Sequence, residues 1–406
     1  MPTAIVRDRF QRPGARRAVA TLAAVSALLV ALLASCGLTL GVIRWANRHP
    51  TLTHDHDVLG PQKFHARAVP RVGGLAVVGA LLLAMLAGMR GHAEARTLGL
   101  VLVACSLPVL GAGLVEDVTK QLSPRRRLLF GALSAALAAV FLGTNITRTD
   151  LPGLDWVVTF TAGSMMLTVF TVTGVSNAIN IIDGFNGLAA MCVAIMLMGL
   201  ASVAFDVGDP AVGWLALAGI GAVFGFFVWN FPAGLVFLGD GGAYFLGFYV
   251  AELSLLLIAR NPEVSPLFPL LLCFYPIFET LFSVYRRRVL HLRAVGMPDG
   301  VHLHSLIYRR VLRWAAGERT ARELTRRNSM TSPYLWVMCM FSVVPAVLFW
   351  DNSLWIGLFL ALFGLGYLAL YWRIVRFRAP RVLRLFGSRP MPLDTRPADA
   401  RDNPET

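Results

Sequence analysis

The sequence predicts an all-α protein that crosses a lipid bilayer about eleven times, and three observations favour this fold class. Of the 406 residues, 56% are hydrophobic and only 15% are charged, whereas soluble domains carry roughly a quarter charged residues. Apolar runs of about 17 to 22 residues recur, each long enough to cross a hydrocarbon core of roughly 30 Å as a helix. Basic residues collect in alternate connections between these runs. No sheet is expected, because lone strands cannot satisfy their backbone hydrogen bonds in lipid.

The candidate spans are apolar runs separated by more polar connections. Their approximate ranges are 18–42, 72–89, 97–115, 128–143, 155–175, 187–205, 211–230, 242–259, 264–285, 334–350 and 353–372. The first span is too long for a signal peptide and lacks a clear small-residue cleavage site, so we expect it to be retained. The five cysteines all fall inside spans without the spacing of a zinc site or a disulfide framework, which favours small core residues.

These spans predict one polytopic domain with a basic tail at each end. The N-terminal tail covers 1–17, the domain covers 18–372 with a long loop at 286–333, and the C-terminal tail covers 373–406. The last residues of the C-terminal tail have the composition of a disordered segment.

The basic residues predict which side of the bilayer is cytoplasmic. One alternate set of connections holds 28 Lys and Arg: 44–71, 116–127, 176–186, 230–241, 286–333 and the tail from 373. The opposite connections hold four. Positive-inside bias therefore places the first set in the cytoplasm, although five arginines in the N-terminal tail would then lie outside. Arginines beside span ends usually contact anionic lipid, so no nucleic-acid partner is expected.

The cytoplasmic connections carry the unusual residues, while the outer connections are short and plain. In order they read "HARAVPRVGG" (65–74), "GLVEDVTKQLSPRRR" (113–127), "NAINIIDGFNGLA" (177–189), "NFPAGLVFLGDGG" (230–242) and "PDGVHLHSLIYRR" (298–310). Each lies where a span meets the same interface. Five polar segments from distant parts of the sequence can therefore converge at one membrane face.

Four acids are placed at the same depth by this topology: Glu116, Asp117, Asp183 and Asp240. Carboxylates at a membrane boundary need compensation, and Mg²⁺ takes one or two carboxylates together with substrate phosphates. Neighbouring basic residues suit phosphate oxygens; they are Arg125, Arg126, Arg127, His302, His304, Arg309 and Arg310. Acids and cations at one interface indicate a phosphoryl-transfer site, where catalysis is mostly positioning and electrostatics.

Structural explanations exist for each of these residues. Asp183 and Asp240 precede glycines, and helix capping could be their sole role. The acidic pair at 116–117 could form an exposed ion pair. The two histidines could be solvated. The location of all five segments on one face favours a site. Packing is the simpler explanation for Phe237, and Glu252 and Glu279, inside spans, stay open between a functional role and internal pairing.

On these residues the chain resembles the polyprenyl-phosphate N-acetylhexosamine-1-phosphate transferases, over about 44–312. "NAINIIDGFNGLA" and "VFLGDGGAYFLG" are highly specific motifs, and "VPRVGG" and "HLHSLIYRR" support them. The eleven spans resemble the branch that transfers GlcNAc-1-phosphate from UDP-GlcNAc to undecaprenyl phosphate. The resemblance implies that undecaprenyl phosphate attacks the β-phosphorus of a UDP-sugar and releases UMP.

The resemblance also implies roles for individual residues. Asp240, with Asp117, would hold Mg²⁺ or its substitute Mn²⁺, and the acidic pair Glu116–Asp117 would assist the lipid phosphate. Asp183 would line the nucleotide-sugar site. The remaining substrate-binding residues implied are Asn180, Asn186, Asn230, Phe237 (against uracil), His302, His304, Arg309 and Arg310.

Two departures from the family pattern bear on the function. The usual acidic pair is Asp-Asp, so the longer Glu116 puts a strict general-base role in doubt; lipid phosphate is largely ionised at neutral pH, so a base is dispensable. Asn186 stands where the muramoyl-pentapeptide transferases carry aspartate, and "HLHS" replaces their longer histidine run. These differences favour an enzyme that starts an envelope polysaccharide such as the O-antigen of lipopolysaccharide.

The sequence therefore predicts a bacterial inner-membrane enzyme that uses an N-acetylated amino-sugar nucleotide, with a homo-oligomer left open. A polytopic transporter is the alternative, since glycine-broken helices fit transporters too. A transporter, however, places its polar site near mid-bilayer, whereas these acids lie at span ends. A third hypothesis, a non-catalytic assembly partner, leaves the four acids without a function.

Overall fold

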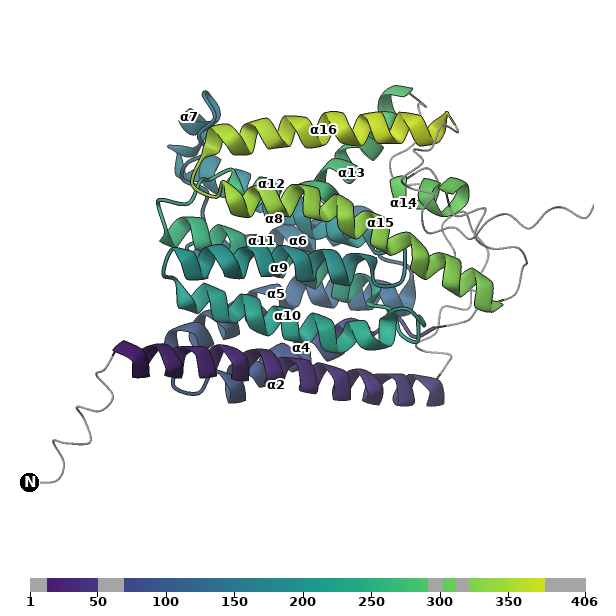
Figure 1. Cartoon of the computed structure of the whole chain (residues 1–406), viewed down its shortest axis with the longest axis horizontal. Coiled ribbons are helices and arrows are strands. Elements are labelled where there is room, and N and C mark those ends of the chain that lie inside the picture. Colours follow the sequence, from purple (N-terminus) through teal and green to yellow (C-terminus); the bar gives the residue numbers. More distant parts are fainter. Residues whose placement is uncertain (1–12, 50–68, 291–301, 312–320, 377–406) are drawn as a thin grey trace, which may run out of the picture.

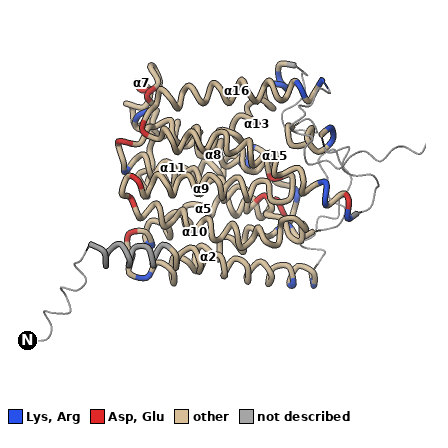
Figure 2. Tube along the Cα trace, in the orientation of Figure 1, with Lys and Arg blue, Asp and Glu red and all other residues tan. Residues whose placement is uncertain are grey.

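A computed structural model of the chain describes residues 13–49, 69–290, 302–311 and 321–376. Every element within these ranges is a helix, which confirms the all-α fold class. Eight of the helices are long and apolar enough to cross a membrane. They lie side by side with roughly parallel axes (Figure 1). Charged residues gather at the two ends of the bundle and leave its middle largely apolar (Figure 2).

The helices follow the predicted spans in order. The eight long ones are α2 (Pro13–Arg48), α5 (Ala93–Thr119), α8 (Thr161–Ile182), α9 (Leu188–Asp206), α10 (Pro210–Asn230), α11 (Gly239–Arg260), α15 (Ala321–Leu348) and α16 (Ser353–Val375). The shorter ones are α4 (Gly73–Leu83), η1 (Ala84–Gly88), α6 (Pro124–Phe141), α7 (Leu154–Val158), α12 (Phe268–Leu272), α13 (Phe274–Tyr285), η2 (Arg286–Leu290), α14 (Leu303–Leu306) and η3 (Ile307–Val311).

The predicted number of spans, eleven, exceeds the eight long apolar helices found in the described residues. The difference falls on three predicted spans. The span at 72–89 is the shorter apolar helix of α4 and η1, and the one at 128–143 lies in α6, which carries three arginines in its first turn. The span at 264–285 is divided between α12 and α13. Most of the two predicted tails lies outside the described residues.

Several helices begin where the sequence supplies a capping side chain followed by proline. Ser123 accepts a hydrogen bond from the backbone of Arg126 at the start of α6. Asp209 accepts one from Val212 at the start of α10. Proline is the next residue in both cases, and its fixed φ suits the first position of a helix. These signals fix where the chain re-enters the bundle.

Helix α11 is the centre of the bundle, since nearly all of its residues are buried, whereas most of α2 and α16 is not. Glycines let its first turn touch two neighbours. A Cβ atom at Gly113 of α5 would collide with the Cα of Gly241, and one at Gly74 of α4 would collide with the Cα of Gly242. Such close backbone approach is available only to small residues. The starts of α4 and α11 and the end of α5 are therefore held together.

The polar segments converge as the sequence predicts. Because successive helices run in opposite directions, α5, α8 and α10 end at the same end of the bundle at which α4, α6, α9 and α11 begin. That end is also where α14 lies (Figure 1). We call it the inner end, because it is the end that positive-inside bias predicts to be cytoplasmic, and the opposite end the outer end.

Candidate active site

Polar side chains from five helix ends meet at the inner end and form what we call the acid–arginine cluster. Its members are Arg71, Glu116, Asp117, Arg127, Asn180 and Asp240. They come from the approach to α4, the end of α5, the start of α6, the last turns of α8 and the start of α11. Of the carboxylates and cations predicted to share one site, Glu116, Asp117, Asp240 and Arg127 are thus neighbours in space.

Asp240 is the hub of this cluster. Its Oδ1 accepts hydrogen bonds from Arg71 Nη2 at 3.3 Å and from Asn180 Nδ2 at 3.2 Å, and its Oδ2 accepts one from Arg127 Nη1 at 2.9 Å. The side chain is 16% exposed. A carboxylate in the first turn of a helix is also favoured by the helix dipole. Asp240 therefore remains accessible while three donors orient it.

Asp117 caps α11 from a different helix. Its Oδ1 accepts from the backbone N–H of Asp240 at 2.8 Å and its Oδ2 from that of Gly241 at 3.0 Å, with Arg71 Nε 3.7 Å away. The side chain is only 1% exposed. Gly239, at the first position of α11, has a positive φ of 77° and no room for a Cβ beside the Arg71 carbonyl. The glycines of the "LGDGG" segment thus allow the backbone at the start of α11 to approach and hydrogen-bond the Asp117 carboxylate.

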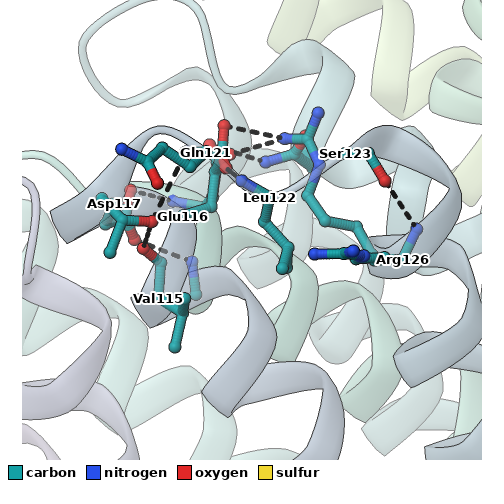
Figure 3. A network of polar contacts seen from close by, with 12 residues as sticks. Val115, Glu116, Asp117, Gln121, Leu122, Ser123 and Arg126 are labelled. Atoms are coloured by element: carbon teal, nitrogen blue, oxygen red, sulfur yellow. Dashed lines mark hydrogen bonds and ion pairs between the residues drawn. The ribbon is translucent and has the colours of Figure 1, made fainter.

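Glu116 holds the bend between α5 and α6 (Figure 3). Its Oε2 accepts from the backbone N–H of Leu122 at 2.7 Å, and its Oε1 lies 3.9 Å from Arg127 Nη1. The predicted alternative of an exposed ion pair at 116–117 is wrong for Asp117, because that side chain is buried. Arg125 and Arg126 are exposed.

Asp183 ends α8 as its C-cap residue, and the Asp183 carboxylate accepts no hydrogen bond from the described part of the chain. It does not cap the following helix, because α9 begins after Gly187, which has a φ of 71°. The residue is half-buried. Burial raises the pKa of Asp183 to about 7, while nearby Arg71 opposes this shift. An open carboxylate next to the acid–arginine cluster is suited to a ligand.

The two predicted histidines are buried rather than solvated, and His304 lies against the residues that follow Asp183. His302 Nδ1 lies 3.0 Å from Oε1 of Glu279, and the His302 and His304 rings stack with centroids 5.1 Å apart. The His304 ring meets Phe185 edge-on at 5.4 Å, and its Nε2 would be 3.6 Å from a Cβ atom built on Gly184. We call Glu279, His302, His304 and Tyr367 the histidine–glutamate cluster.

The asparagines of the predicted set divide into two kinds. Asn180 reaches Asp240. Asn186 is buried and donates to Ser329 Oγ at 3.1 Å, and Asn230 accepts from the backbone of Gly187 at 2.6 Å. These two side chains brace the loop that follows Asp183, so their predicted contact with substrate stays a prediction.

Phe237 and the two arginines of "YRR" lie at the same end. Phe237 is half-buried, and its backbone pairs with Pro70, whose carbonyl accepts its N–H at 2.8 Å. Arg310 donates to the carbonyl of Ile374 at 3.2 Å, while Arg309 is exposed. Their predicted roles toward a substrate stay predictions as well.

Three residues of the two clusters have no individual role that the sequence predicts. Arg71 is one basic residue among many in a basic loop, and Tyr367 is one aromatic residue in an apolar span. The sequence leaves Glu279 open between a functional role and internal pairing, and the structure shows it paired. The sequence signal that points to Glu279 is a lone carboxylate in an otherwise apolar segment.

The donor chemistry of the inner end fits Mg²⁺, which prefers carboxylate and amide oxygens. Asp240 and the open Asp183 supply such oxygens. In the described residues, no three His, Cys, Asp or Glu side chains form a group that could hold a metal ion. A Mg²⁺ site here would therefore use few protein carboxylates and fill its remaining positions with substrate phosphates and water, which is usual for this ion.

Comparison with known proteins agrees with the predicted family. The model of the family described as glycosyl transferase family 4 matches residues 99–258. A Bacillus subtilis protein named "Probable undecaprenyl-phosphate N-acetylglucosaminyl 1-phosphate transferase" is 31% identical over 303 residues, which cover 74% of this chain and 78% of that protein. The chain belongs to this family. It is thus an enzyme of the sugar-phosphate transferase class, and the transporter alternative is wrong.

Other relatives show the spread of the family. An undecaprenyl-phosphate alpha-N-acetylglucosaminyl 1-phosphate transferase of Thermotoga maritima is 28% identical over 258 residues, covering 62% of this chain and 72% of that protein. A phospho-N-acetylmuramoyl-pentapeptide-transferase of Geobacillus kaustophilus is 32% identical over 211 residues, but these cover 48% of this chain and 64% of that protein. The similarity is therefore more extensive to the GlcNAc-1-phosphate transferases.

Proposed function

We propose that this enzyme transfers an N-acetylated amino-sugar 1-phosphate from a UDP-sugar to undecaprenyl phosphate. In this reaction the acceptor phosphate oxygen forms a bond to the β-phosphorus, the bond from the β-phosphorus to the oxygen that bridges the two phosphates breaks, and UMP leaves with that oxygen. The observation that carries the proposal is the acid–arginine cluster beside the open carboxylate of Asp183, at one end of a membrane bundle. The names of the relatives support the acceptor and the sugar.

The arginines of the cluster are suited to the phosphates. Arg71 and Arg127 hold Asp240 from opposite oxygens, and guanidinium groups form strong paired hydrogen bonds with phosphate. Asp117 fixes the first turn of α11 and so sets the position of Asp240. Mg²⁺, or Mn²⁺, held by Asp240 with Asp117 and Asp183 beside it, would supply positive charge to the diphosphate.

The bond between Glu116 and Leu122 N–H makes Glu116 a support for the bend near Arg127 rather than a proton acceptor. The reaction does not need a base, because a phosphate monoester with a second pKa near 6 is largely ionised at neutral pH. Catalysis then depends on alignment and charge compensation, as in other phosphoryl transfers.

The location and pathway follow from the charge distribution and the donor. The inner end is the basic end of the chain, and under positive-inside bias this supports a site at the cytoplasmic face of a bacterial inner membrane. UDP-sugars are cytoplasmic nucleotides, so a site on this face has access to them. The product, a lipid-linked sugar diphosphate, would start an envelope polysaccharide such as O-antigen.

The test is a panel of UDP-sugars offered to the purified protein with undecaprenyl phosphate and Mg²⁺, with UMP release measured. We expect UMP to appear with an N-acetylated amino sugar such as UDP-GlcNAc, and only when the acceptor lipid is present. Release without the acceptor would indicate hydrolysis, and no release with any sugar would refute the proposal. Asp240→Asn in the same detergent is the negative control.

A further inference from the structure

The strongest feature that the proposed mechanism leaves unused is the buried carboxylate of Glu279, in the middle of α13. Its side chain is 2% exposed. Oε1 accepts from the backbone N–H of Leu303 at 3.0 Å and lies 3.0 Å from His302 Nδ1, while Oε2 accepts from the hydroxyl of Tyr367 at 2.6 Å. Three helical segments, α13, α14 and α16, therefore meet on one carboxylate.

This arrangement constrains His302 in two ways. The Leu303 bond fixes the backbone next to the histidine, and the Nδ1 contact fixes the ring. Because an ionised carboxylate only accepts hydrogen bonds, the proton of the imidazole is placed on Nδ1. In this tautomer Nε2 is the ring nitrogen that can accept a hydrogen bond. His304 follows, since its ring stacks on His302 and lies against the Asp183–Gly184 segment.

A purely structural function explains these contacts less well. Burying a carboxylate in an apolar helix costs free energy that hydrogen bonds only partly offset, and apolar residues of similar size often stabilise a core at least as well. Glu252 of α11 shows the contrast within the same chain. It is equally buried, but one hydrogen bond, from Thr144 at 2.7 Å, connects it to a loop at the outer end.

We propose that Glu279 is a positioning residue for sugar-phosphate transfer: it fixes the tautomer and orientation of His302 and, through the stacked rings, the place of His304 beside Asp183. The inference rests on the proposed function, because it assigns the two histidines to the donor's diphosphate or sugar. Tyr367 is the second anchor and ties the carboxylate to α16.

The decisive variant is Glu279→Gln. Glutamine has the same shape, and with its oxygen at the Oε1 position it can accept from Leu303 and His302 while its amide donates to Tyr367, so a structural role predicts activity within about twofold of wild type. The variant removes the negative charge beside the imidazole, and its amide can also turn its NH2 group toward the ring, so it no longer holds the His302 proton on Nδ1. A positioning role predicts a kcat/KM lower by about 10- to 100-fold, the usual effect of removing a carboxylate that orients a histidine. We expect most of the loss in kcat. Glu252→Gln is the matched control and should leave UMP release within about twofold.

A double-mutant cycle with His302→Ala separates the two explanations further. If Glu279 acts through His302, adding Glu279→Gln to His302→Ala should cause little further loss of kcat/KM, since residues that act as a unit are not additive. Full additivity of the two losses would overturn the inference.

The histidine ¹⁵N spectrum of the wild-type protein gives a measurement that does not depend on activity or on a folded variant. With His302 assigned by its loss in His302→Gln, we expect Nδ1 to be protonated, and a neutral ring protonated on Nε2 instead would overturn the inference. Wild-type protein that releases no UMP while its His302 shows the Nδ1 proton would refute the proposed function but not the tautomer. Active wild-type protein with unimpaired Glu279→Gln would refute the positioning role alone.

Discussion

A network of charged side chains lies at each end of helix α11, one at the inner end of the bundle and one at the outer end. The two networks differ in whether their carboxylates are all paired with donors of the protein. At the outer end, Arg260 donates to Asp209 at 2.6 Å and to Glu94 at 2.8 Å. Asp209 also caps α10 and accepts from Asn261 at 3.2 Å. Both carboxylates of this network have a donor from the protein, and the cation lies at the C-terminus of a helix, where the dipole favours it.

The outer end also has a hollow of about 360 Å³. It is lined by Glu94, Gly208, Asp209, Pro210, Arg260 and Asn261. Concavity alone would make it a candidate site. Its charged groups, however, are the paired ones just described, and their hydrogen bonds hold helix ends together. We attribute this network to stability rather than to chemistry.

The inner end has the opposite character. Two arginines share Asp240, the neighbouring Asp183 accepts no hydrogen bond from the described residues, and His304 lies against Gly184 and Phe185, which follow Asp183. The comparison teaches that an ion-pair network is not evidence of a site by itself. A carboxylate left open beside paired cations is the informative feature.

Asp240→Asn should give the largest effect on activity. Asparagine keeps an acceptor for Arg71 and Asn180 but removes the charge that balances the two arginines and would hold Mg²⁺. We expect kcat to fall by about 10³-fold, the upper range for one electrostatic group in a site. UMP release measures the loss of kcat, and the unfolding temperature in detergent shows whether the variant is folded. Wild-type turnover by a folded variant would contradict the assignment of the inner end.

Asp183→Asn should lower kcat/KM by roughly 10²-fold and remove a pH dependence. Burial raises the pKa of Asp183 to about 7, so the carboxyl is neutral below pH 7 and charged above it. In the wild type, kcat/KM should therefore rise about tenfold per pH unit up to pH 7 and level off above it, because this ratio reports the free enzyme. The variant should lack the rise between about pH 6 and pH 7 and keep only the one below it, where the acceptor phosphate, with a second pKa near 6, gains a proton. An unchanged pH profile in Asp183→Asn would assign the titration elsewhere.

The sequence allowed the inner end to be predicted because helix direction alternates. Asp117 and Asp183 lie where α5 and α8 end, and Asp240 lies where α11 begins, so the alternation of helix direction brings all three to one side of the bundle. What Asp117 does there could not be predicted. Its bonds to the α11 amides require α5 and α11 to touch at Gly113 and Gly241, a contact between residues far apart in the sequence.

The same limit applies to residues that share a motif. Asn180 and Asn186 lie within "NAINIIDGFN", yet the first reaches Asp240 and the second bonds to α15. Helix α8 ends between these two asparagines, at Asp183, and the chain changes direction there. The identity of the two residues does not predict this change of direction. Hydropathy also missed the break between α12 and α13, because it measures composition and not continuity.

Gly113→Ala should have an intermediate effect that joins packing to activity. The new methyl group would meet the backbone of α11 at Gly241, which cannot move as a side chain can. We expect a loss of about 1–3 kcal/mol of stability and reduced UMP release, since Asp240 shifts with its helix. Gly111→Ala on the same helix is the matched control, because a Cβ there has no neighbour within 4 Å. Equal behaviour of the two variants would mean that this contact does not position Asp240.

Asp209→Asn should have the smallest effect on activity and so tests the comparison from the outer end. The change removes the charge opposite Arg260, which is 34% exposed. Solvent screening therefore limits the expected loss to about 1–2 kcal/mol of stability. UMP release should stay within about twofold of wild type while the unfolding temperature falls by a few degrees. A tenfold loss of kcat in a folded Asp209→Asn protein would show that the outer network takes part in catalysis, and the two ends of α11 could then no longer be separated by function.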